Sequence, residues 1–323
     1  MGRDSTMDRL RASNGRPRAR FRPALRMAVL VLFNPISGAG RALATAQRLA
    51  HALEAEGREV GLVPTERRPG EQWLRPRLAG AEALVVVGGD GAVRLSAAEA
   101  ARAGVPLWHA PTGTENLFAR AFGMSRDPRV LIDALRRGAT RSIDLGFAGD
   151  ETFAIMGSIG FDAEVVHALD AVRTGAISHL SYARPILERF GAWRPGPLAW
   201  SIDGEREELG PGVVVVGNLP EYGVRLNPAA TAVPDDGLLD AVYLPARNAL
   251  ELLHWVPFLR LGLHERHPWL RVRRGRRIDL HAPPGTRLQL DGDPAARPAS
   301  EDGAIAFRTA PGALRLLLPR DAG

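Results

Sequence analysis

Two residue types are absent from this chain of 323 residues: it has no cysteine and no lysine, and all 42 basic residues are arginine. The lack of cysteine excludes disulfides, thiol catalysis and zinc or iron–sulfur sites built on cysteine. The lack of lysine excludes a GxxxxGK[ST] phosphate loop and Schiff-base chemistry. A phosphate bound by this chain must therefore be held by backbone N–H groups, hydroxyls, arginine or a metal ion.

Long apolar runs are also absent. No window approaches 18 uninterrupted apolar residues, so we expect a cytoplasmic protein without a membrane-spanning helix, whose membrane contact is peripheral. The net charge of +6 is carried by residues 1–26, which hold eight arginines and two aspartates but no apolar core of a secretory signal. We expect a disordered basic tail there, with weak attraction to anionic lipid as the alternative. Because the rest of the chain is neutral, no nucleic-acid partner is expected.

Residues 27–140 show the pattern of an α/β nucleotide-binding domain with a parallel sheet. Apolar runs of strand length end in polar turns that contain glycine, and helical patterns follow them. Such turns lie at the carboxyl edge of a parallel sheet, where backbone N–H groups can bind anions. The turns are NPISGAG (34–40), GGDG (88–91) and PTGTEN (111–116). The GGDG turn is the strongest candidate for the floor of a phosphate site, because its glycines allow close backbone approach.

From residue 141 to residue 318 the pattern changes to short strands separated by Gly, Pro and Asp turns, which predicts a β-sandwich or a barrel. Helical insertions are expected at 164–190 and 246–263, and residues 319–323 form a short tail. The apolar stretch 250–263 fits a packed helix, with a membrane-dipping helix as the alternative.

Six motifs in this order resemble the diacylglycerol kinase catalytic-domain family, which includes bacterial lipid kinases and sphingosine kinases. They are NPISGAG, GGDGA, PTGTEN, MGSIGFDAEV, VPDDGLLD and LDGD. The resemblance implies an N-terminal α/β domain, a C-terminal β-sandwich and an active site between them. It also implies ATP and Mg²⁺ as cofactors, and a lipid hydroxyl, on diacylglycerol or a similar lipid, as acceptor. By matching motif positions, the nucleotide would contact Asn34, Pro35, Ser37, Gly38, Thr65, Gly88, Gly89, Asp90, Gly91, Arg94, Thr114 and Asn116.

Two acidic residues are implied to be catalytic. Asp293 occupies the last position of the family's DGE motif, whose acid is taken as the general base, although here its stem is one methylene shorter. Asp90 would hold Mg²⁺ or an ordered water, or orient the acceptor hydroxyl. The DGD sequence is also typical of a hairpin turn, which is the alternative interpretation.

The VPDDGLLD stretch resembles the family's structural magnesium loop. In that loop the ligands would be the Asp236 carboxylate and the carbonyl groups of Val233 and Leu238, since oxygen ligands suit a hard cation. The sequence PDDG is equally typical of a β-turn, and this alternative stays open.

The chain departs from the family pattern directly after the GGDG turn, where Ala92, Arg94 and Leu95 replace the usual threonine, asparagine and glutamate. Arg94 could bind a phosphate in place of the lost amide, or the departures could mark a catalytically silent nucleotide- or lipid-binding module. An NAD kinase shares the GGDG turn, and a nucleic-acid binder that acts through the basic tail is a more distant alternative. The sequence leaves the oligomeric state open, a dimer included.

Overall fold

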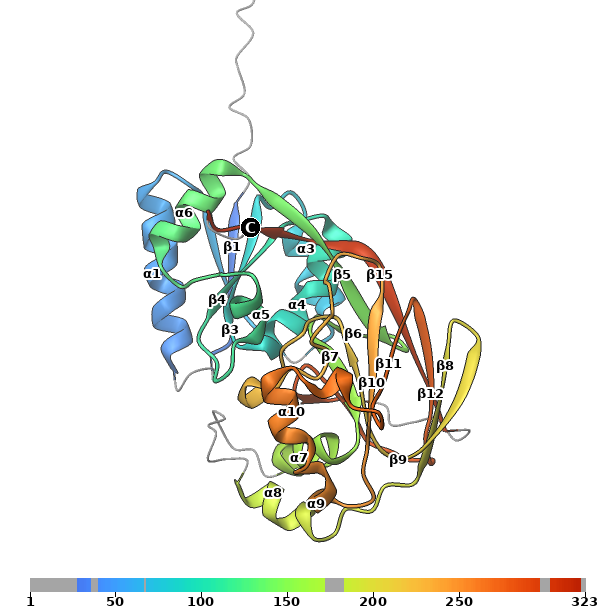
Figure 1. Ribbon diagram of the computed structural model, residues 1–323. Coiled ribbons are helices and arrows are strands. Elements are labelled where there is room, and N and C mark those ends of the chain that lie inside the picture. Colours follow the sequence, from blue (N-terminus) through green and yellow to red (C-terminus); the bar gives the residue numbers. More distant parts are fainter. Residues whose placement is uncertain (1–27, 36–39, 67, 172–182, 297–302, 321–323) are drawn as a thin grey trace, which may run out of the picture.

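The computed structural model describes residues 28–35, 40–66, 68–171, 183–296 and 303–320 (Figure 1). The predicted tail 1–26 and two of the predicted nucleotide contacts, Ser37 and Gly38, lie outside these residues. No helix among the described residues is long and apolar enough to cross a membrane.

The N-terminal half is built on a parallel sheet. Its strands lie in the order β4-β3-β1-β2, and each pairs in parallel with its neighbour. Every residue of β1 and β3 is buried, as expected for continuous apolar runs covered on both faces. The strands are β1 (Val29–Phe33), β2 (Val60–Pro64), β3 (Ala83–Gly88) and β4 (Leu107–Pro111).

Helices cover both faces of this sheet. Figure 1 shows α1 and α6 on one side and α3 and α4 on the other. The sequence predicts a packed face of α1 that carries Leu43, Ala46, Leu49, Ala50 and Leu53. All are buried except Leu43, which is exposed, while Ala42 lies on the buried face instead. The helices are α1 (Arg41–Ala55), α2 (Gly70–Trp73), α3 (Arg75–Leu78), α4 (Asp90–Ala103), α5 (Leu117–Ala121) and α6 (Pro128–Arg137).

The C-terminal half is a β-sandwich, so of the two predicted architectures the sandwich is confirmed. Its strands pair antiparallel, and the inward side chains of both sheets form a second core that includes Trp200 and Phe307. The strands are β5 (Thr140–Ala148), β6 (Glu151–Phe153), β7 (Met156–Ile159), β8 (Pro197–Ile202), β9 (Glu205–Gly217), β10 (Leu239–Pro245), β11 (Arg271–Gly275), β12 (Arg277–His281), β13 (Leu288–Leu290), β14 (Asp293–Pro294) and β15 (Ala304–Leu317).

Helices interrupt the sandwich at the two places where the sequence predicts insertions. The first insertion contains α7 (Phe161–Ala171) and α8 (Ala183–Phe190), and the residues between them lie outside the described part of the chain. The second contains α9 (Ala249–Leu252), α10 (Trp255–Leu261) and the 3₁₀ turn η4 (His264–Arg266). A further 3₁₀ turn, η3 (Gly223–Arg225), follows β9.

The last strand belongs to both halves. The sequence predicts two strands, 304–308 and 314–318, whereas the structure joins them into β15 across a register shift between Ala310 and Leu314. The far end of β15 pairs in parallel with β4 through Leu316, and β5 lies antiparallel along most of its length. This shared ribbon fixes how the two halves meet.

Candidate active site

The glycines after β3 and β4 let the two turns touch backbone to backbone. A Cβ atom on Gly113 would lie 2.7 Å from the Cα of Gly89, closer than a real Cβ comes to another heavy atom. Gly89 precedes α4 in an extended conformation, and the helix begins at Asp90. The N–H groups of the first turn of α4 thus lie at the carboxyl edge of the sheet, the position predicted for a phosphate site.

Asp90 ties the two turns together. Its carboxylate accepts hydrogen bonds from the N–H groups of Leu117 and Phe118, both at 3.0 Å, and so caps the start of α5. Asn116 has a φ of 53° and stabilises its own turn through its side-chain amide. The amide oxygen accepts the N–H of Gly113 at 2.8 Å, and the amide nitrogen donates to the carbonyl of Gly113 at 2.9 Å. The side chains of Asp90 and Asn116 therefore hold the glycine turns in place.

A histidine that the sequence analysis missed is hydrogen-bonded to the start of the GGDG turn. His109 lies fully buried in β4, where its Nε2 donates a hydrogen bond to the carbonyl of Gly88 at 3.0 Å. Burial lowers the pKa of His109, so the ring stays neutral and keeps this donor. The sequence feature that could have indicated this role is a polar residue within the otherwise apolar strand β4.

Asp293 meets the glycine turn across the boundary between the two halves of the chain. A Cβ atom on Gly91 would lie 2.6 Å from Oδ2 of Asp293, so the carboxylate rests where only a glycine leaves room. Asp293 lies in β14, which pairs with β13 through Leu290. The two strongest catalytic motifs, about two hundred residues apart in sequence, are therefore in contact.

The other aspartate of the DGD motif has a structural role. Asp291 adopts a left-handed conformation, with a φ of 52°, and its carboxylate accepts three backbone N–H groups. These come from Ala154 at 2.7 Å and from Ile155 and Met156 at 2.9 Å each. Burial raises the pKa of Asp291 to about 6, and the three N–H groups oppose that rise. Asp291 thus fixes the turn that carries Asp293.

A polar cluster behind this turn was also missed by the sequence analysis. Gln289 accepts the N–H of Gly292 at 2.8 Å and donates to the hydroxyl of Ser158 at 2.6 Å. Ser158 in turn donates to Asp162, which also accepts from the hydroxyl of Tyr222 at 3.2 Å. Burial raises the pKa of Asp162. Ser158 and Asp162 belong to the MGSIGFDAEV motif. The hydrophobic periodicity of the sequence could not predict that this motif lies beside the hairpin of Asp291 and Asp293.

Arg94 has partners other than the phosphate that the sequence suggested. Its Nε donates to the carbonyl of Thr152 at 3.0 Å, and its Nη2 pairs with Glu151 at 2.8 Å. Glu151 also accepts the N–H of Ala296 at 2.9 Å. Arg94 therefore connects α4 to β6 and to the chain just beyond Asp293, which helps to hold the two halves in register.

The remaining predicted nucleotide contacts lie at the same edge of the sheet. The N–H of Asn34 donates to Val87 at 3.2 Å, and the N–H of Thr65 donates to Phe33 at 2.9 Å, so both residues extend the strand ends next to Gly88. Pro35 and Thr114 are exposed in the first and third turns.

The predicted metal loop contacts β5, where the N–H of Asp144 donates to the carbonyl of Pro234. The carboxylate of Asp236 accepts the N–H of Leu238 at 3.0 Å, which forms an Asx turn, and Val233 is exposed. Among the described residues there is no group of three or more His, Asp or Glu side chains arranged to hold a metal ion.

Comparison with known proteins agrees with this architecture. Residues 28–148 match the diacylglycerol kinase catalytic domain, and residues 156–318 match the YegS C-terminal NAD kinase beta sandwich-like domain. A protein named diacylglycerol kinase from Mycobacterium tuberculosis is 29% identical, over 90% of this chain and 95% of its own length. A protein named "Probable lipid kinase YegS-like" from Pseudomonas fluorescens is 33% identical, over 84% of this chain and 95% of its own.

The fold itself is similar to that of a solved diacylglycerol kinase from Bacillus anthracis, with a TM-score of 0.66 at 15% identity, over 92% of this chain and 98% of that one. An α/β domain joined to a β-sandwich is thus the architecture of this chain, and its two halves match the diacylglycerol kinase catalytic domain and the YegS C-terminal domain. The chain therefore belongs to the diacylglycerol kinase catalytic-domain family, a family of lipid kinases.

Proposed function

We propose that this chain is an ATP-dependent kinase that phosphorylates a hydroxyl group of diacylglycerol or of a similar lipid. The observation that supports it most is the contact between Asp293 and Gly91, which places a carboxylate beside the candidate phosphate site. The names of the relatives agree with a lipid acceptor.

In the proposed reaction, the acceptor hydroxyl attacks the γ-phosphorus in line with the oxygen that bridges to the β-phosphate. The new P–O bond forms to the lipid, the bridging P–O bond breaks, and ADP leaves. Asp293 accepts the hydroxyl proton. The N–H groups of the glycine turns stabilise the charge on the phosphates, and an Mg²⁺ ion carried by ATP would neutralise part of that charge. Asp90 keeps these turns in register through α5.

The direct test is transfer of labelled phosphate from ATP to a panel of lipids that includes diacylglycerol, monoacylglycerol and a sphingoid base, with NAD as a competing acceptor. Labelled lipid supports the proposal, and labelled NADP instead would identify an NAD kinase. Stabilisation of the folded protein by nucleotide without turnover on any acceptor would support the silent module suggested by Ala92, Arg94 and Leu95.

We also propose that the second helical insertion rests on an anionic membrane surface. Its inner face packs on the domain through Trp255 and Leu259, while Leu250, Leu261 and Trp269 are 65–70% exposed. Tryptophan and leucine at a surface favour the interfacial region of a bilayer. Exposed arginines lie in the same part of the chain and complement the charge of anionic lipid: Arg247, Arg260, Arg266, Arg271 and Arg273. The last two also face Glu207, at 3.3 and 3.6 Å.

Replacing both Leu250 and Leu261 by aspartate is expected to weaken binding to vesicles of phosphatidylcholine and phosphatidylglycerol by roughly 10- to 100-fold, because two apolar contacts are lost. Sedimentation with the vesicles measures the loss. Leu43→Asp, at an exposed position of α1, is the matched control and should bind as the unaltered chain does. Equal binding by control and double variant would contradict the proposal, and a dimer that the Leu43→Asp control keeps but the double variant loses would assign this surface to a second copy. Activity on a short-chain, water-soluble acceptor should be unchanged, which separates this proposal from the first.

A further inference from the structure

The acidic side chains of the PDDG loop already have partners of the opposite charge. Asp235 pairs with Arg141 at 2.8 Å. The loop is also pinned by the buried Asp144, whose N–H donates to the carbonyl of Pro234 at 2.6 Å and whose carboxylate accepts the N–H of Gly237 at 2.6 Å. The loop is therefore anchored to β5 by contacts within the chain.

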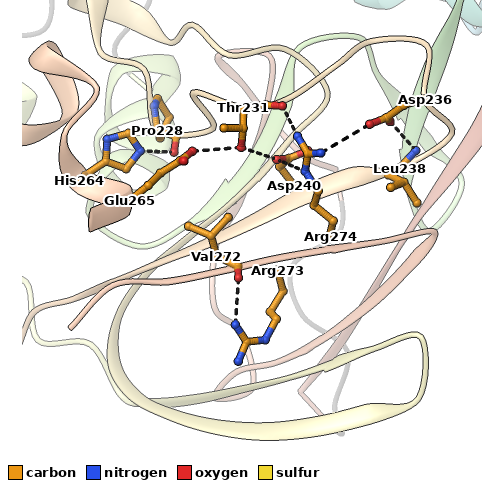
Figure 2. Close-up of polar contacts among 10 residues, drawn as sticks. All are labelled: Pro228, Thr231, Asp236, Leu238, Asp240, His264, Glu265, Val272, Arg273 and Arg274. Carbon is orange, nitrogen blue, oxygen red and sulfur yellow. Dashed lines mark hydrogen bonds and ion pairs between the residues drawn. The ribbon is translucent and has the colours of Figure 1, made fainter. Parts of the chain in front are cut away.

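A further contact with the loop comes from Arg274 on β11. Its Nε donates to Oδ1 of Asp240 at 2.9 Å, and its guanidinium also donates to the carbonyl of Thr231. A third nitrogen, Nη1, lies 3.9 Å from Oδ2 of Asp236. Figure 2 shows the guanidinium between these three groups, which lie on both sides of the loop. It reaches them because Arg274 stands directly opposite Asp240 in the pairing of β10 with β11.

The buried carboxylate of Asp240 requires a positive charge beside it. Asp240 is 1% exposed, and burial raises its pKa, whereas the hydrogen bond from Arg274 favours the charged form. The hydroxyl of Thr231 lies within hydrogen-bond distance of both Asp240, at 3.2 Å, and Glu265, at 3.0 Å. A buried carboxylate in such a cluster is costly unless a positive charge faces it.

We propose that the guanidinium of Arg274 takes the place of the structural divalent cation in this loop, so that the loop keeps its conformation without a metal ion. One of the implied ligands, the Asp236 carboxylate, lies 3.9 Å from the guanidinium, and the Asp240 carboxylate and the Thr231 carbonyl accept its hydrogen bonds. Oxygen groups of this kind would also suit a hard cation. A divalent ion bound to Asp236 would lie beside a positive charge that arginine does not lose at any physiological pH.

The neighbouring Arg273 does not share the position of Arg274 beside the loop. Its side chain points to the opposite side of β11, where it donates to the carbonyl of Val272 at 3.0 Å and lies 3.6 Å from Glu207. It has no contact with the loop. Arg273→Ala therefore removes the same charge from the same strand and serves as the matched control.

The test is thermal unfolding without nucleotide, in EDTA and in millimolar Mg²⁺. The unaltered chain and Arg273→Ala should unfold at the same temperature in both buffers, to within about 1 °C. Arg274→Ala should unfold roughly 5 °C or more lower in EDTA, because Asp240 is left buried without its partner. Mg²⁺ should then restore part of that loss, since the vacated position offers oxygen ligands to a hard cation.

Two results would overturn the proposal. One is a fall in the unfolding temperature of the unaltered chain in EDTA that Mg²⁺ reverses, which would show that the loop depends on a metal ion. The other is an Arg274→Ala variant that behaves as Arg273→Ala does, or that is destabilised without any recovery in Mg²⁺. If Arg274→Ala does not fold, Arg274→Gln keeps a planar donor of similar shape without the charge, and the same comparison applies to it.

Discussion

Replacement of Asp293 by asparagine is expected to lower the rate of phosphoryl transfer by about 10²- to 10⁴-fold, the usual contribution of a general base. Asparagine has nearly the same shape but cannot accept the proton of the acceptor hydroxyl. Because asparagine keeps the size of the side chain that lies against Gly91, the unfolding temperature and nucleotide affinity should remain close to those of the unaltered chain. Steady-state kinetics with a lipid acceptor, beside thermal unfolding, measures both.

Asp291 supplies the contrast, because it lies in the same hairpin and is of the same residue type. An asparagine there would direct an NH₂ group at N–H donors of residues 154–156, so Asp291→Asn should lower the free energy of unfolding by about 1–3 kcal/mol. If Asp293→Asn kept more than a tenth of the activity while Asp291→Asn abolished it without loss of stability, the roles assigned to the two aspartates would be reversed.

The second large effect is expected for Gly91→Ala. The added methyl group would meet Oδ2 of Asp293, and the carboxylate would have to turn away from the phosphate site. A displacement of about an ångström in a catalytic group can cost on the order of 100-fold in rate. Gly91 is the second residue of α4, where alanine is compatible with the helix, so the free energy of unfolding should stay close to that of the unaltered chain.

The control for this change is Gly191→Ala, at a glycine where a Cβ atom would meet nothing within 4 Å. Both variants are compared by kcat with a lipid acceptor and by thermal unfolding. A Gly91→Ala variant as active as Gly191→Ala would contradict the idea that Asp293 works from its position against the glycine turn.

Much of the fold could be predicted from local patterns. The apolar runs of β1 and β3, the helix α1 and the turns at 88–91 and 111–116 all appear where the sequence indicated them, although Leu43, expected on the packed face of α1, is exposed. These features depend on residues that are close in sequence, so a short stretch of sequence is enough to predict them. The joining of β15 across both halves was not predicted, because a strand that pairs with β4 and β5 at once is specified by contacts distant in sequence.

The candidate site divides in the same way. Glycine turns and the acids of GGDG and LDGD are visible as motifs, but their roles follow from partners elsewhere in the chain. Asp90 caps α5, Asp291 binds residues 154–156, and Arg94 pairs with Glu151. Only the fold supplies those partners, and for the same reason the sequence could not show that Arg274 lies against Asp236.

The central claim is that a nucleotide bound by the glycine turns presents its γ-phosphate to Asp293. A crystal structure with a non-hydrolysable ATP analogue and Mg²⁺ tests this most directly. The expected result is a γ-phosphate between the first turn of α4 and the Asp293 carboxylate, with Arg94 still paired to Glu151. A nucleotide bound away from the Gly88–Gly91 turn, or an Asp293 side chain directed away from its γ-phosphate, would contradict the account.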